Sequence, residues 1–395
     1  MLFLCNVVPY PPDGGVHLRI FNLLKRVAEK HEVVVGAHSW DESDEAGAAW
    51  MTRNGMRTVT GRLVAGNWRH AIPALRALLT SGQPPEVVQY QAPELRKLIA
   101  TERFDVIQVE ETILAPYLDY LPKDSTAKTV ITFHNIHYVQ ARRIAQIEQT
   151  RWTRLWRHIN GLLMKRFEAA IARRFDRNIV VSEPDRALLA DIAPRVPIDV
   201  LPNGVDTEML ALLPEPTHKR TLLFVGTLNY RPCIDAVLWM AQEILPLLRT
   251  RYPDLEFWIV GKLPPREIED LAGNGIFVTG HVPDVTPYYR RATVSVVPLR
   301  AGGGSRLKIL EAMSLGRPVV STTIGAEGLE VVHQNQLLLA DDAEAFAEAV
   351  SRLFDEEELW RSLVDNARRH VVAHHDWEAI AQRQLEIYDE LVDGT

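Results

Sequence analysis

At 395 residues the chain is too long for one ordinary hydrophobic core and suits two domains of about 150–200 residues each. Its formal net charge of −7 argues against a nucleic-acid-binding protein, which would carry a basic surplus. The two cysteines, Cys5 and Cys233, are too few for a disulfide framework, so a reducing compartment is the simpler expectation.

The first residues form a short apolar run that does not have the pattern of a signal peptide. Met1–Val8 has no basic segment before it and is followed at once by Pro9-Tyr-Pro-Pro12. No apolar run approaches the roughly 20 residues of a membrane span. We therefore expect Leu2–Val8 to be a buried first strand and the protein to be cytoplasmic.

The first half of the chain alternates continuous apolar runs with helical stretches. This alternation is typical of a parallel sheet that helices cover on both faces. Helices are expected at Val16–Lys30 and Glu183–Ala190. The strands expected after Leu2–Val8 are His31–Ala37, Val106–Val109, Thr129–Phe133, Asn178–Val181 and Ile198–Leu201.

A polar stretch with two prolines, Leu213–Arg220, interrupts the alternation and is typical of a linker. The pattern then starts again, so we expect two doubly wound α/β domains with a ligand site in the cleft between them. Helices are expected at Ile234–Arg249, Arg266–Ala272, Leu307–Leu315 and Trp377–Val392. Strands are expected at Thr221–Val225, Glu256–Val260, Ile276–Thr279, Val294–Val297 and Val319–Ser321.

The segment Gln140–Arg177 is strongly basic, with ten Lys and Arg residues against three acidic ones. Trp152, Trp156 and several leucines are interleaved with these charges. Two interpretations stay open. A solvated helix that packs its apolar stripe on the first domain is the more common case for a run of charge. The other is a peripheral contact of residues 140–177 with an anionic membrane surface.

Two glycine turns each stand between an expected strand and an expected helix. The first, Pro11-Pro-Asp-Gly-Gly-Val16, is an ordinary turn pattern when taken alone. The second is Arg300-Ala-Gly-Gly-Gly-Ser-Arg-Leu-Lys-Ile-Leu-Glu-Ala-Met313. A glycine-rich turn that opens a helix presents backbone N–H groups to an anion.

Three charged side chains accompany the second turn. Arg306 and Lys308 would lie beside a bound pyrophosphate as charge-assisted donors. Glu311, about one turn into the helix, is suited to accept hydrogen bonds from two ribose hydroxyls. The alternative is a glycine loop with surface charges. A phosphate loop of the Walker type is excluded because no Gly-Lys-Ser/Thr occurs.

At this point the sequence resembles the retaining glycosyltransferases of family 4. The resemblance runs through almost the whole chain and is closest to a bacterial subgroup associated with exopolysaccharide synthesis. The number, order and spacing of short motifs carry it. Besides the two glycine turns they are Thr132-Phe-His-Asn135, Val181-Ser-Glu183, Leu201-Pro-Asn-Gly-Val-Asp206, Phe224-Val-Gly226, Ile259-Val-Gly261, Val278-Thr-Gly-His-Val282 and Asp376-Trp-Glu378.

The resemblance implies the GT-B fold, in which two Rossmann-like, doubly wound α/β domains face each other across a cleft. Residues 1–205 would form the N-terminal, acceptor-side domain. Residues 206–375 would form the C-terminal domain that binds the nucleotide sugar. Residues 376–395 would form a crossover helix that packs on the N-terminal domain.

Carried over position by position, the resemblance implies a donor site made largely of backbone groups. Gly14 and Gly15 would approach the donor diphosphate, and His134 would hydrogen-bond the donor sugar. Glu311 would bind the ribose, and backbone groups up to Val282 would meet the base. The other donor-binding positions that we expect are Asn203, Gly226, Arg231, Gly303, Gly304, Ser305 and Leu307.

The chain departs from the family pattern at two places. The first of two glutamates that the family usually carries would fall at Gly303, so backbone N–H groups of Gly303–Ser305 would have to recognise the sugar instead. The family also has Arg and Lys where this chain has Thr227 and Pro232. Arg231 is displaced by one position, and we expect Arg306 and Lys308 to replace the lost charge.

The mechanism that the resemblance implies is a front-face transfer with retention. His134, Lys308 and Arg306 would be the catalytic residues, with the two cations stabilising charge on the leaving diphosphate. No metal is expected, because no Asp-x-Asp segment follows a strand. No cofactor is expected either, since the UDP- or GDP-sugar is a co-substrate.

The acceptor is left open among saccharides, lipid-linked compounds and small molecules, and no nucleic-acid partner is expected. Two other functions remain open. A catalytically inactive homologue that only binds a nucleotide sugar is suggested by the missing glutamate at Gly303. A sugar-nucleotide epimerase would share the two-domain architecture and would convert the donor without an acceptor.

Overall fold

The structure is a computed structural model that describes residues 1–12, 14–63, 87, 92–148, 150–216, 220–303 and 306–394. Its chain forms two compact units. The first unit contains Met1–Arg142, Leu155–Pro202 and Glu378–Thr395, and the second contains Arg143–Arg154 and Asn203–Trp377. The expected division of the chain into domains at residues 205 and 375 stays a prediction.

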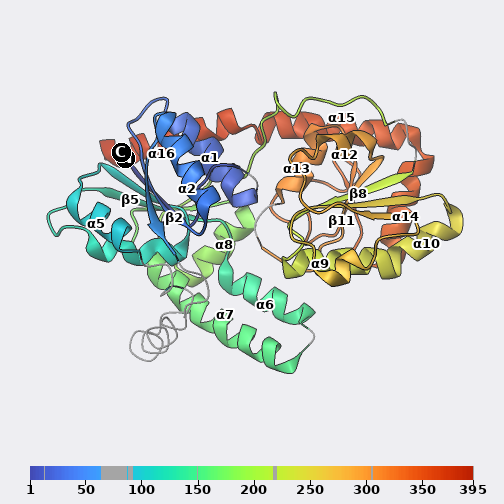
Figure 1. The fold of residues 1–395 in the computed structure, drawn as a ribbon, viewed down its shortest axis with the longest axis horizontal. Helices are drawn as coiled ribbons and strands as arrows, with labels where there is room; N and C mark the ends of the chain where they lie inside the picture. Colours follow the sequence, from blue (N-terminus) through green and yellow to red (C-terminus); the bar gives the residue numbers. More distant parts are fainter. Residues whose placement is uncertain are drawn as a thin grey trace. The chain divides into compact units, whose positions relative to one another are not determined.

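The first unit is built on a seven-stranded sheet in the order β3-β2-β1-β4-β5-β6-β7, and every neighbouring pair is parallel (Figure 1). Leu2 lies opposite Val34 on one side and Ile107 on the other. The central strands are buried throughout, as strands covered on both faces are. The strands are β1 Leu2–Cys5, β2 Val34–Ser39, β3 Arg57–Arg62, β4 Val106–Val109, β5 Lys128–Phe133, β6 Arg177–Val180 and β7 Ile198–Val200.

Helices connect these strands, and α6 and α7 lie side by side (Figure 1). An ideal Cβ at Gly161 of α7 would lie 3.6 Å from the side chain of Ala141 of α6, so these helices pack on each other. The helices are α1 Gly15–Val27, α2 Glu42–Arg53, α5 Pro93–Thr101, η2 Thr112–Tyr120, α6 His137–Ile147, α7 Arg151–Ala172 and α8 Glu183–Ile192.

Several of these elements were not expected from the sequence. The edge strand β3 reads Arg-Thr-Val-Thr-Gly-Arg and is mostly solvent-accessible, so it lacks the apolar run of a buried strand. Helix α2 buries only Gly47, Ala48 and Met51, which leaves no apolar stripe to detect.

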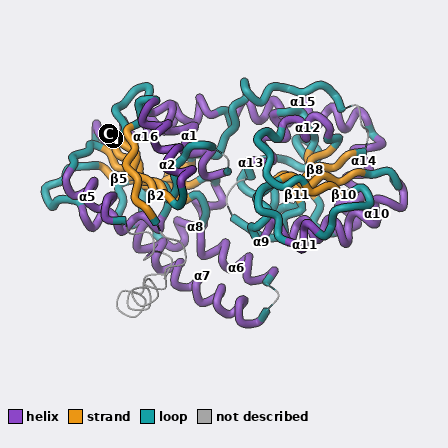
Figure 2. The backbone as a smooth tube through the Cα atoms, viewed as in Figure 1, coloured by secondary structure: helices purple, strands orange, loops and turns teal. Residues whose placement is uncertain are grey.

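The second unit is built on a six-stranded parallel sheet in the order β10-β9-β8-β11-β12-β13. Helices cover both faces: α12 and α13 lie on one side of the sheet, and α9, α10 and α11 lie on the other (Figures 1 and 2). The fold class expected from the alternating pattern is thus confirmed in both units. The strands are β8 Thr221–Val225, β9 Glu256–Val260, β10 Ile276–Val278, β11 Val294–Val297, β12 Val319–Ser321 and β13 Leu338–Leu339.

The single helix expected at Ile234–Arg249 is divided in the structure. A π-helical turn, η3 Met240–Ile244, separates α9 Arg231–Trp239 from α10 Leu245–Arg251. Pro246 has no N–H to donate to the preceding turn, and a wider turn relieves the resulting clash. The other helices of this unit are α11 Arg266–Glu269, α12 Thr286–Arg291, α13 Leu307–Ser314, α14 Ala343–Asp355 and α15 Glu357–His374.

Two corrections concern the second unit. Leu213–Arg220, expected to be a linker, has its described residues inside this unit: the Leu213 amide donates to the Leu315 carbonyl at 3.2 Å. Helices α14 and α15 were not expected, although Asp342 caps α14 by accepting from the Ala345 amide.

The last helix, α16 Trp377–Asp393, belongs to the first unit from Glu378 onward, so its predicted return to that domain is confirmed. Its Tyr388 hydroxyl donates to Oε1 of Gln108 on β4 at 3.0 Å. No helix among the described residues is both long and apolar enough to cross a membrane.

Candidate active site

The second glycine turn follows β11 and opens α13, as the sequence predicts. Gly302 has a φ of +123°, and a Cβ there would lie 2.8 Å from Nη2 of Arg306, so only glycine fits. Arg306 is the N-cap of α13, and its Nη1 donates to the carbonyl of Gly303. The turn therefore folds back on its own arginine. Gly304 and Ser305 lie outside the described residues.

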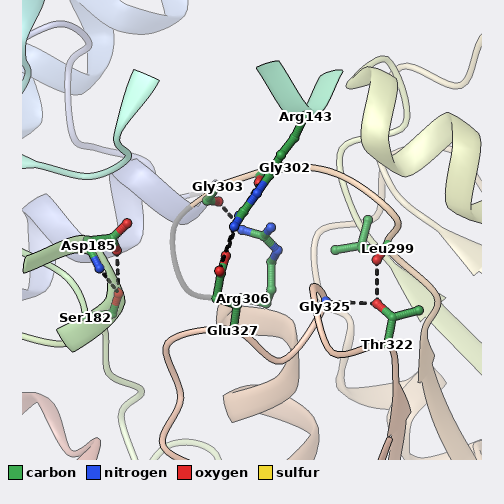
Figure 3. A network of polar contacts seen from close by, with 10 residues as sticks. All are labelled: Arg143, Ser182, Asp185, Leu299, Gly302, Gly303, Arg306, Thr322, Gly325 and Glu327. Carbon is green, nitrogen blue, oxygen red and sulfur yellow. Dashed lines mark hydrogen bonds and ion pairs between the residues drawn. The ribbon is translucent and has the colours of Figure 1, made fainter. Parts of the chain in front are cut away.

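A bidentate ion pair between Arg143 and Glu327 lies beside this turn (Figure 3). Arg143 of α6 donates from Nη2 to Oε1 of Glu327 at 2.7 Å and from Nη1 to Oε2. The same Nη1 donates to the carbonyl of Gly302 at 3.1 Å. Arg143 thereby ties the glycine turn to the loop after β12.

Hydrogen bonds and close packing fix the conformation of that loop. The Gly325 amide donates to Oγ1 of Thr322 at 2.9 Å, and this hydroxyl donates to the carbonyl of Leu299 (Figure 3). A Cβ at Gly325 would lie 2.4 Å from Oγ of Ser321 and 2.7 Å from the carbonyl of Val297. Glu327 is therefore presented by a loop that has little freedom to shift.

Lys308 is directed from α13 towards the end of β8. Its Nζ lies 4.2 Å from the centre of the Phe224 ring and 3.9 Å from Sγ of Cys233 on α9. A Cβ at Gly226 would lie 2.7 Å from the same Nζ. The structure thus brings together two residues predicted for the donor site, Lys308 and Gly226.

Close backbone approach explains the glycines beside Lys308. A Cβ at Gly261 would lie 1.7 Å from the carbonyl oxygen of Gly226. The Gly261 amide in turn donates to the carbonyl of Gly280 at 3.2 Å, which brings the Val278–Val282 stretch to the same end of the sheet. Val282 and Leu307 are partly buried against the core of this unit.

Glu311 lies one turn after Lys308 and is also partly buried. Burial raises the pKa of Glu311 above its usual range, while the charge of Lys308 and a hydrogen bond with Tyr289 act in the opposite direction. Tyr289 is fully buried on α12, and its hydroxyl also lies 3.3 Å from the carbonyl of Lys308. The carboxyl group is thus held beside the cation.

Burial also acts on the two cations. It lowers the pKa of Lys308, with Cys233 and Glu311 opposing and Arg306 adding to the effect. It lowers the pKa of Arg306 as well, although a guanidinium keeps its charge. Two partly buried positive groups that lie near each other form a site that favours an anion.

Arg231 occupies a different environment. It begins α9, its Nη2 donates to the carbonyl of Ile147 at 3.2 Å, and its Nη1 lies 4.0 Å from Oε1 of Glu267. No contact between Arg231 and Lys308 or Arg306 is among those described. Its predicted donor-binding role stays a prediction.

In the first unit, Gly14 and Gly15 start α1. Gly14 is the N-cap with extended backbone, and the first turn of the helix contains no acidic side chain. The Leu18 amide donates to the Gly14 carbonyl at 2.8 Å. The predicted position of these glycines, between β1 and a helix N-terminus, agrees with the structure.

His134 follows β5 and is buried beside a carboxylate that the sequence analysis did not single out. Its Nε2 lies 3.0 Å from Oε2 of Glu110, which follows β4. The neighbouring pair repeats this arrangement, with His137 Nε2 3.1 Å from Oε2 of Glu111. Burial alone would raise the pKa of Glu111, but His137 and His134 outweigh it and leave that pKa below its usual value.

Asn203 lies at the start of the second unit. Its carbonyl oxygen is 2.8 Å from Nδ1 of the buried His375, and burial lowers the pKa of His375 to about 4. The Val205 amide donates to the His375 carbonyl at 2.8 Å, so the Asn203 turn is joined to the chain before α16.

The sequence analysis missed Arg143 and Glu327 as parts of the site. Arg143 was counted in the basic segment as a solvated or membrane-facing charge, and the structure corrects this: the residue is partly buried against Glu327. No sequence signal joins the two, because 184 positions separate them. Glu110 and Glu111, by contrast, directly follow a buried strand, which is a usual position for functional groups.

Two cavities are lined by none of the predicted site residues. One of about 370 Å³ is lined by residues of α15 that include His370 and His374, and one of about 260 Å³ is lined by residues such as Met1 and Glu102. The described residues contain no group of three or more His, Cys, Asp or Glu side chains arranged to hold a metal.

Two sequence families match the chain and together span most of it. The family described as Glycosyltransferase Family 4 matches residues 13–209, and that described as Glycosyl transferases group 1 matches residues 219–356. The first match contains the strands of the seven-stranded sheet except β1, and the second contains all strands of the six-stranded sheet.

Similar proteins have related descriptions. A phosphatidyl-myo-inositol mannosyltransferase of Mycolicibacterium smegmatis is 28% identical over 76% of this chain and 75% of its own length. An uncharacterized 44.6 kDa protein in the cps region of Klebsiella pneumoniae is 24% identical over 87% of each chain.

Solved structures share the fold over the full length. Sucrose-phosphate synthase of Thermosynechococcus elongatus aligns with a TM-score of 0.74 and 21% identity, covering 100% of this chain and 99% of its own. Anabaena HepE, in complex with UDP and glucose, aligns with a TM-score of 0.69 and 16% identity over 99% of each chain. With the family matches, these findings confirm the resemblance: the chain belongs to glycosyltransferase family 4 and is a glycosyltransferase of the GT-B fold.

Proposed function

We propose that the protein transfers a sugar from a nucleotide diphosphate donor, a UDP- or GDP-sugar, to an acceptor hydroxyl with retention of configuration and without a metal. The observation that carries this proposal is the position of Lys308, whose ammonium group lies against Gly226 at the end of β8. Family members usually have an arginine directly after this glycine, where this chain has Thr227. Lys308 supplies the missing charge at that position.

The glycine turn is the second half of the diphosphate site in this proposal. Arg306 is held within the turn by Gly303, and α13 begins directly after it. The helix N-terminus and Arg306 would bind the phosphate oxygens, because both favour negative charge. Gly14 and Gly15 would contact the same diphosphate through backbone N–H groups.

Glu311 binds the ribose in this proposal. A carboxylate accepts hydrogen bonds from two vicinal hydroxyls, provided that it is ionised. Lys308 and Tyr289 favour the ionised form against the effect of burial. The base would lie along the Val278–Val282 stretch, which comes to the same end of the sheet.

The sugar is recognised without the glutamate that Gly303 replaces. Backbone N–H groups of Gly303–Ser305 and the imidazole of His134 would take over its hydrogen bonds. Glu110, 3.0 Å from His134, would fix the orientation of that ring. This gives the acidic residue at the end of β4 a positioning role.

The chemical step is a front-face displacement. The bond between the anomeric carbon and the diphosphate oxygen breaks, and its electron pair stays on the diphosphate. The acceptor oxygen forms the new bond from the same face, and its proton passes to a donor phosphate oxygen. Lys308 and Arg306 stabilise the charge that develops on the leaving group.

The similar proteins and the free cysteines support a choice of acceptor, donor and compartment. The similar mannosyltransferase is named for a phosphatidyl-inositol substrate, which favours a lipid-linked acceptor here, and the cps-region relative favours exopolysaccharide synthesis. UDP in the HepE complex favours a UDP-sugar donor. The free cysteines Cys5 and Cys233 fit a reducing, cytoplasmic compartment.

The test is a transfer assay with several UDP- and GDP-sugars against saccharide, lipid-linked and small phenolic acceptors, with and without a chelator. We expect a glycosylated product by mass, an unchanged anomeric configuration by NMR, and no loss of rate with the chelator. An inverted product, or activity that depends on a metal, would contradict the mechanism.

A catalytically inactive homologue is the second candidate, because Gly303 stands where the family has a glutamate. Such a protein would bind a nucleotide sugar in a calorimeter yet transfer it to no acceptor. An epimerase would instead change the donor when no acceptor is present. The same assay separates all three functions.

A further inference from the structure

Helix α7, Arg151–Ala172, exposes a continuous apolar stripe to solvent. Single exposed apolar side chains are normal, but a contiguous group of large ones marks an interaction surface. The stripe has an i, i+3, i+4, i+7 spacing, so its members share one face of the helix. The exposed fractions are 81% for Trp152, 50% for Leu155, 48% for Trp156, 50% for Ile159 and 68% for Leu162.

The stripe is distinct from the side of α7 that packs on the protein. The first unit buries Met164, Phe167 and Ile171 in the C-terminal half of α7. Their mean direction differs from that of the stripe by about 115° at 3.6 residues per turn, and Phe167 comes closest to it. The exposed stripe spans an arc of about 120°, as wide as the core-facing side of an ordinary amphipathic helix. Folding therefore buries the apolar side chains in the C-terminal half of α7 and leaves those from Trp152 to Leu162 exposed.

Positive charge borders the exposed stripe. Arg151, Arg154 and Lys165 lie in the row next to it, and Arg166 lies within it at helical spacing. The one acidic residue of α7, Glu168, is fully buried and accepts hydrogen bonds from the backbone amides of His137 and Tyr138. The exposed part of the helix therefore carries cations and no carboxylate.

We propose that this face of α7 docks on an anionic lipid surface. Trp and Leu side chains would enter the boundary between headgroups and acyl chains, and the adjacent Arg and Lys side chains would bind lipid phosphates. A protein partner with an apolar groove would explain the stripe but not the cations along it. Helix α7 itself exposes no carboxylate, and the exposed carboxylate near these cations comes from α8, where Oδ2 of Asp191 lies 3.9 Å from Nζ of Lys165. The helix lies in the plane of the membrane, because its charges do not allow it to span one.

This inference goes beyond sugar transfer and does not rest on it. Binding to vesicles needs neither donor nor acceptor, so the two proposals fail independently. If the inference holds, the protein works at a membrane whatever acceptor it uses.

Co-sedimentation with vesicles tests the proposal. The protein should sediment with phosphatidylcholine vesicles that contain about 30% phosphatidylglycerol and stay in solution with phosphatidylcholine alone. Raising the salt concentration from about 0.1 M to about 1 M should release most of it. Equal binding to both vesicle types, or no binding to either, would overturn the proposal.

Matched variants assign the binding to α7. The double variant Trp156→Glu with Leu162→Glu should bind anionic vesicles at least about tenfold more weakly. Met209→Glu, which changes a side chain that is 82% exposed in the second unit, should bind like the unchanged protein. Arg151→Glu with Lys165→Glu should also weaken binding, whereas Arg53→Glu with Arg266→Glu, the same change of net charge elsewhere, should have less effect.

A measurement on the folded protein removes any dependence on variant stability. Vesicles with brominated acyl chains should quench part of the tryptophan fluorescence, and Trp152→Phe with Trp156→Phe should abolish that quenching. Undiminished quenching in this variant would overturn the proposal. So would a stable dimer by size exclusion that the Trp156→Glu, Leu162→Glu variant dissociates, because a second copy would then cover the stripe.

Discussion

Arg143 and Glu327 are 184 positions apart in the chain and form a bidentate ion pair, with Nη2 and Oε1 at 2.7 Å. Arg143 also donates to the carbonyl of Gly302, so the pair fixes the turn that we assign to the donor diphosphate. Neither residue needs to touch the donor for this effect. Both act as positioning residues.

Arg143→Ala should therefore weaken donor binding. The change leaves Glu327 and the Gly302 carbonyl without their partner, a loss of about 1–3 kcal/mol, and we expect the donor KM to rise about tenfold or more. Steady-state kinetics with varied donor, at saturating acceptor, measure this. The kcat should fall less than kcat/KM, since Arg143 does not contact the reacting atoms.

The exchanged pair, Arg143→Glu with Glu327→Arg, provides the control. It restores an ion pair but not the bond to Gly302, so its KM should lie between those of the single Arg143→Ala variant and the unchanged protein. Arg143→Lys keeps the charge and loses the bidentate geometry, so it should recover little. Purely additive effects of the two exchanges would rule out the coupling.

Substitutions at Lys308 and Glu311 should have different effects, the first mainly on kcat and the second mainly on nucleotide binding. Lys308→Ala removes charge that matters most as the diphosphate leaves, and we expect kcat to fall about 100-fold. Glu311→Ala removes the ribose contacts, and we expect nucleotide binding to weaken about tenfold with a smaller change of kcat. Kinetics together with calorimetric titration of UDP and GDP measure both effects.

The matched variants here are Lys308→Arg and Glu311→Gln. Lys308→Arg keeps the charge and should retain more turnover than Lys308→Ala, although the larger head meets Cys233 and Phe224. Glu311→Gln keeps the shape without the charge, so it should bind nucleotide less well than the unchanged protein. Transfer kinetics unchanged in both alanine variants would count decisively against this site.

The sequence predicted buried strands better than partly exposed ones. Strands β1 and β8 are buried and consist of apolar runs, so the sequence predicted both. The predicted bounds of β8 agree with the observed ones, whereas β1 ends at Cys5 and not at Val8. The edge strand β3 was missed because it is only partly buried and because polar residues outnumber apolar ones in it. Helix α15 was missed although its buried positions repeat at helical spacing, so there the signal was present.

For the candidate site, what could be predicted depended on whether the residues are close together in the sequence. Residues whose role depends on backbone geometry, such as Gly226 and Gly302, stand in local patterns that the sequence displays. Arg143 and Glu327 meet only through the fold, and the two side chains are far apart in sequence, so no local pattern contains them. The sequence analysis expected Lys308, together with Arg306, to replace the charge of the missing family residues, but it did not predict that Lys308 lies against Gly226.

Gly226→Ala and Gly261→Ala should fail in different ways. A Cβ at Gly226 would meet Nζ of Lys308, the flexible end of a side chain, so Lys308 should be displaced and kcat should fall. The same Cβ would lie 3.2 Å from Sγ of Cys233 and 3.2 Å from a ring carbon of Phe224, so some stability should be lost as well, but less than in Gly261→Ala. A Cβ at Gly261 would meet the backbone of Gly226 at 1.7 Å, so this variant should lose roughly 3 kcal/mol or more of unfolding free energy.

Denaturant unfolding and kinetics of both variants measure the difference. Gly161→Ala is the control, because a Cβ there meets only ordinary contacts of 3.5 Å and 3.6 Å and favours the helix. Equal losses of stability in Gly226→Ala and Gly261→Ala would show that Lys308 does not yield as we expect.

Glu168 should make stability depend on pH. Burial raises its pKa to about 7 from a usual value of 4.5, so the folded protein binds this proton more tightly than the unfolded chain. The stabilisation is complete below pH 4.5 and is lost as the pH rises through about 7. A shift of this size corresponds to about 3 kcal/mol.

The measurement is denaturant unfolding of the unchanged protein and of Glu168→Gln across that pH range. The unfolding free energy of the unchanged protein should fall relative to the variant by about 3 kcal/mol, because glutamine has no proton to lose. Titrating groups that do not interact with Glu168 cancel in the difference. Parallel curves for the two proteins would contradict a buried, proton-binding Glu168.

A crystal structure with an intact nucleotide sugar tests the central claim most directly. We expect the diphosphate within about 3 Å of Lys308 Nζ and of the backbone N–H groups that open α13, with the ribose hydroxyls on Glu311. A nucleotide bound elsewhere, with Lys308 still resting on Phe224 and away from any phosphate, would contradict the account.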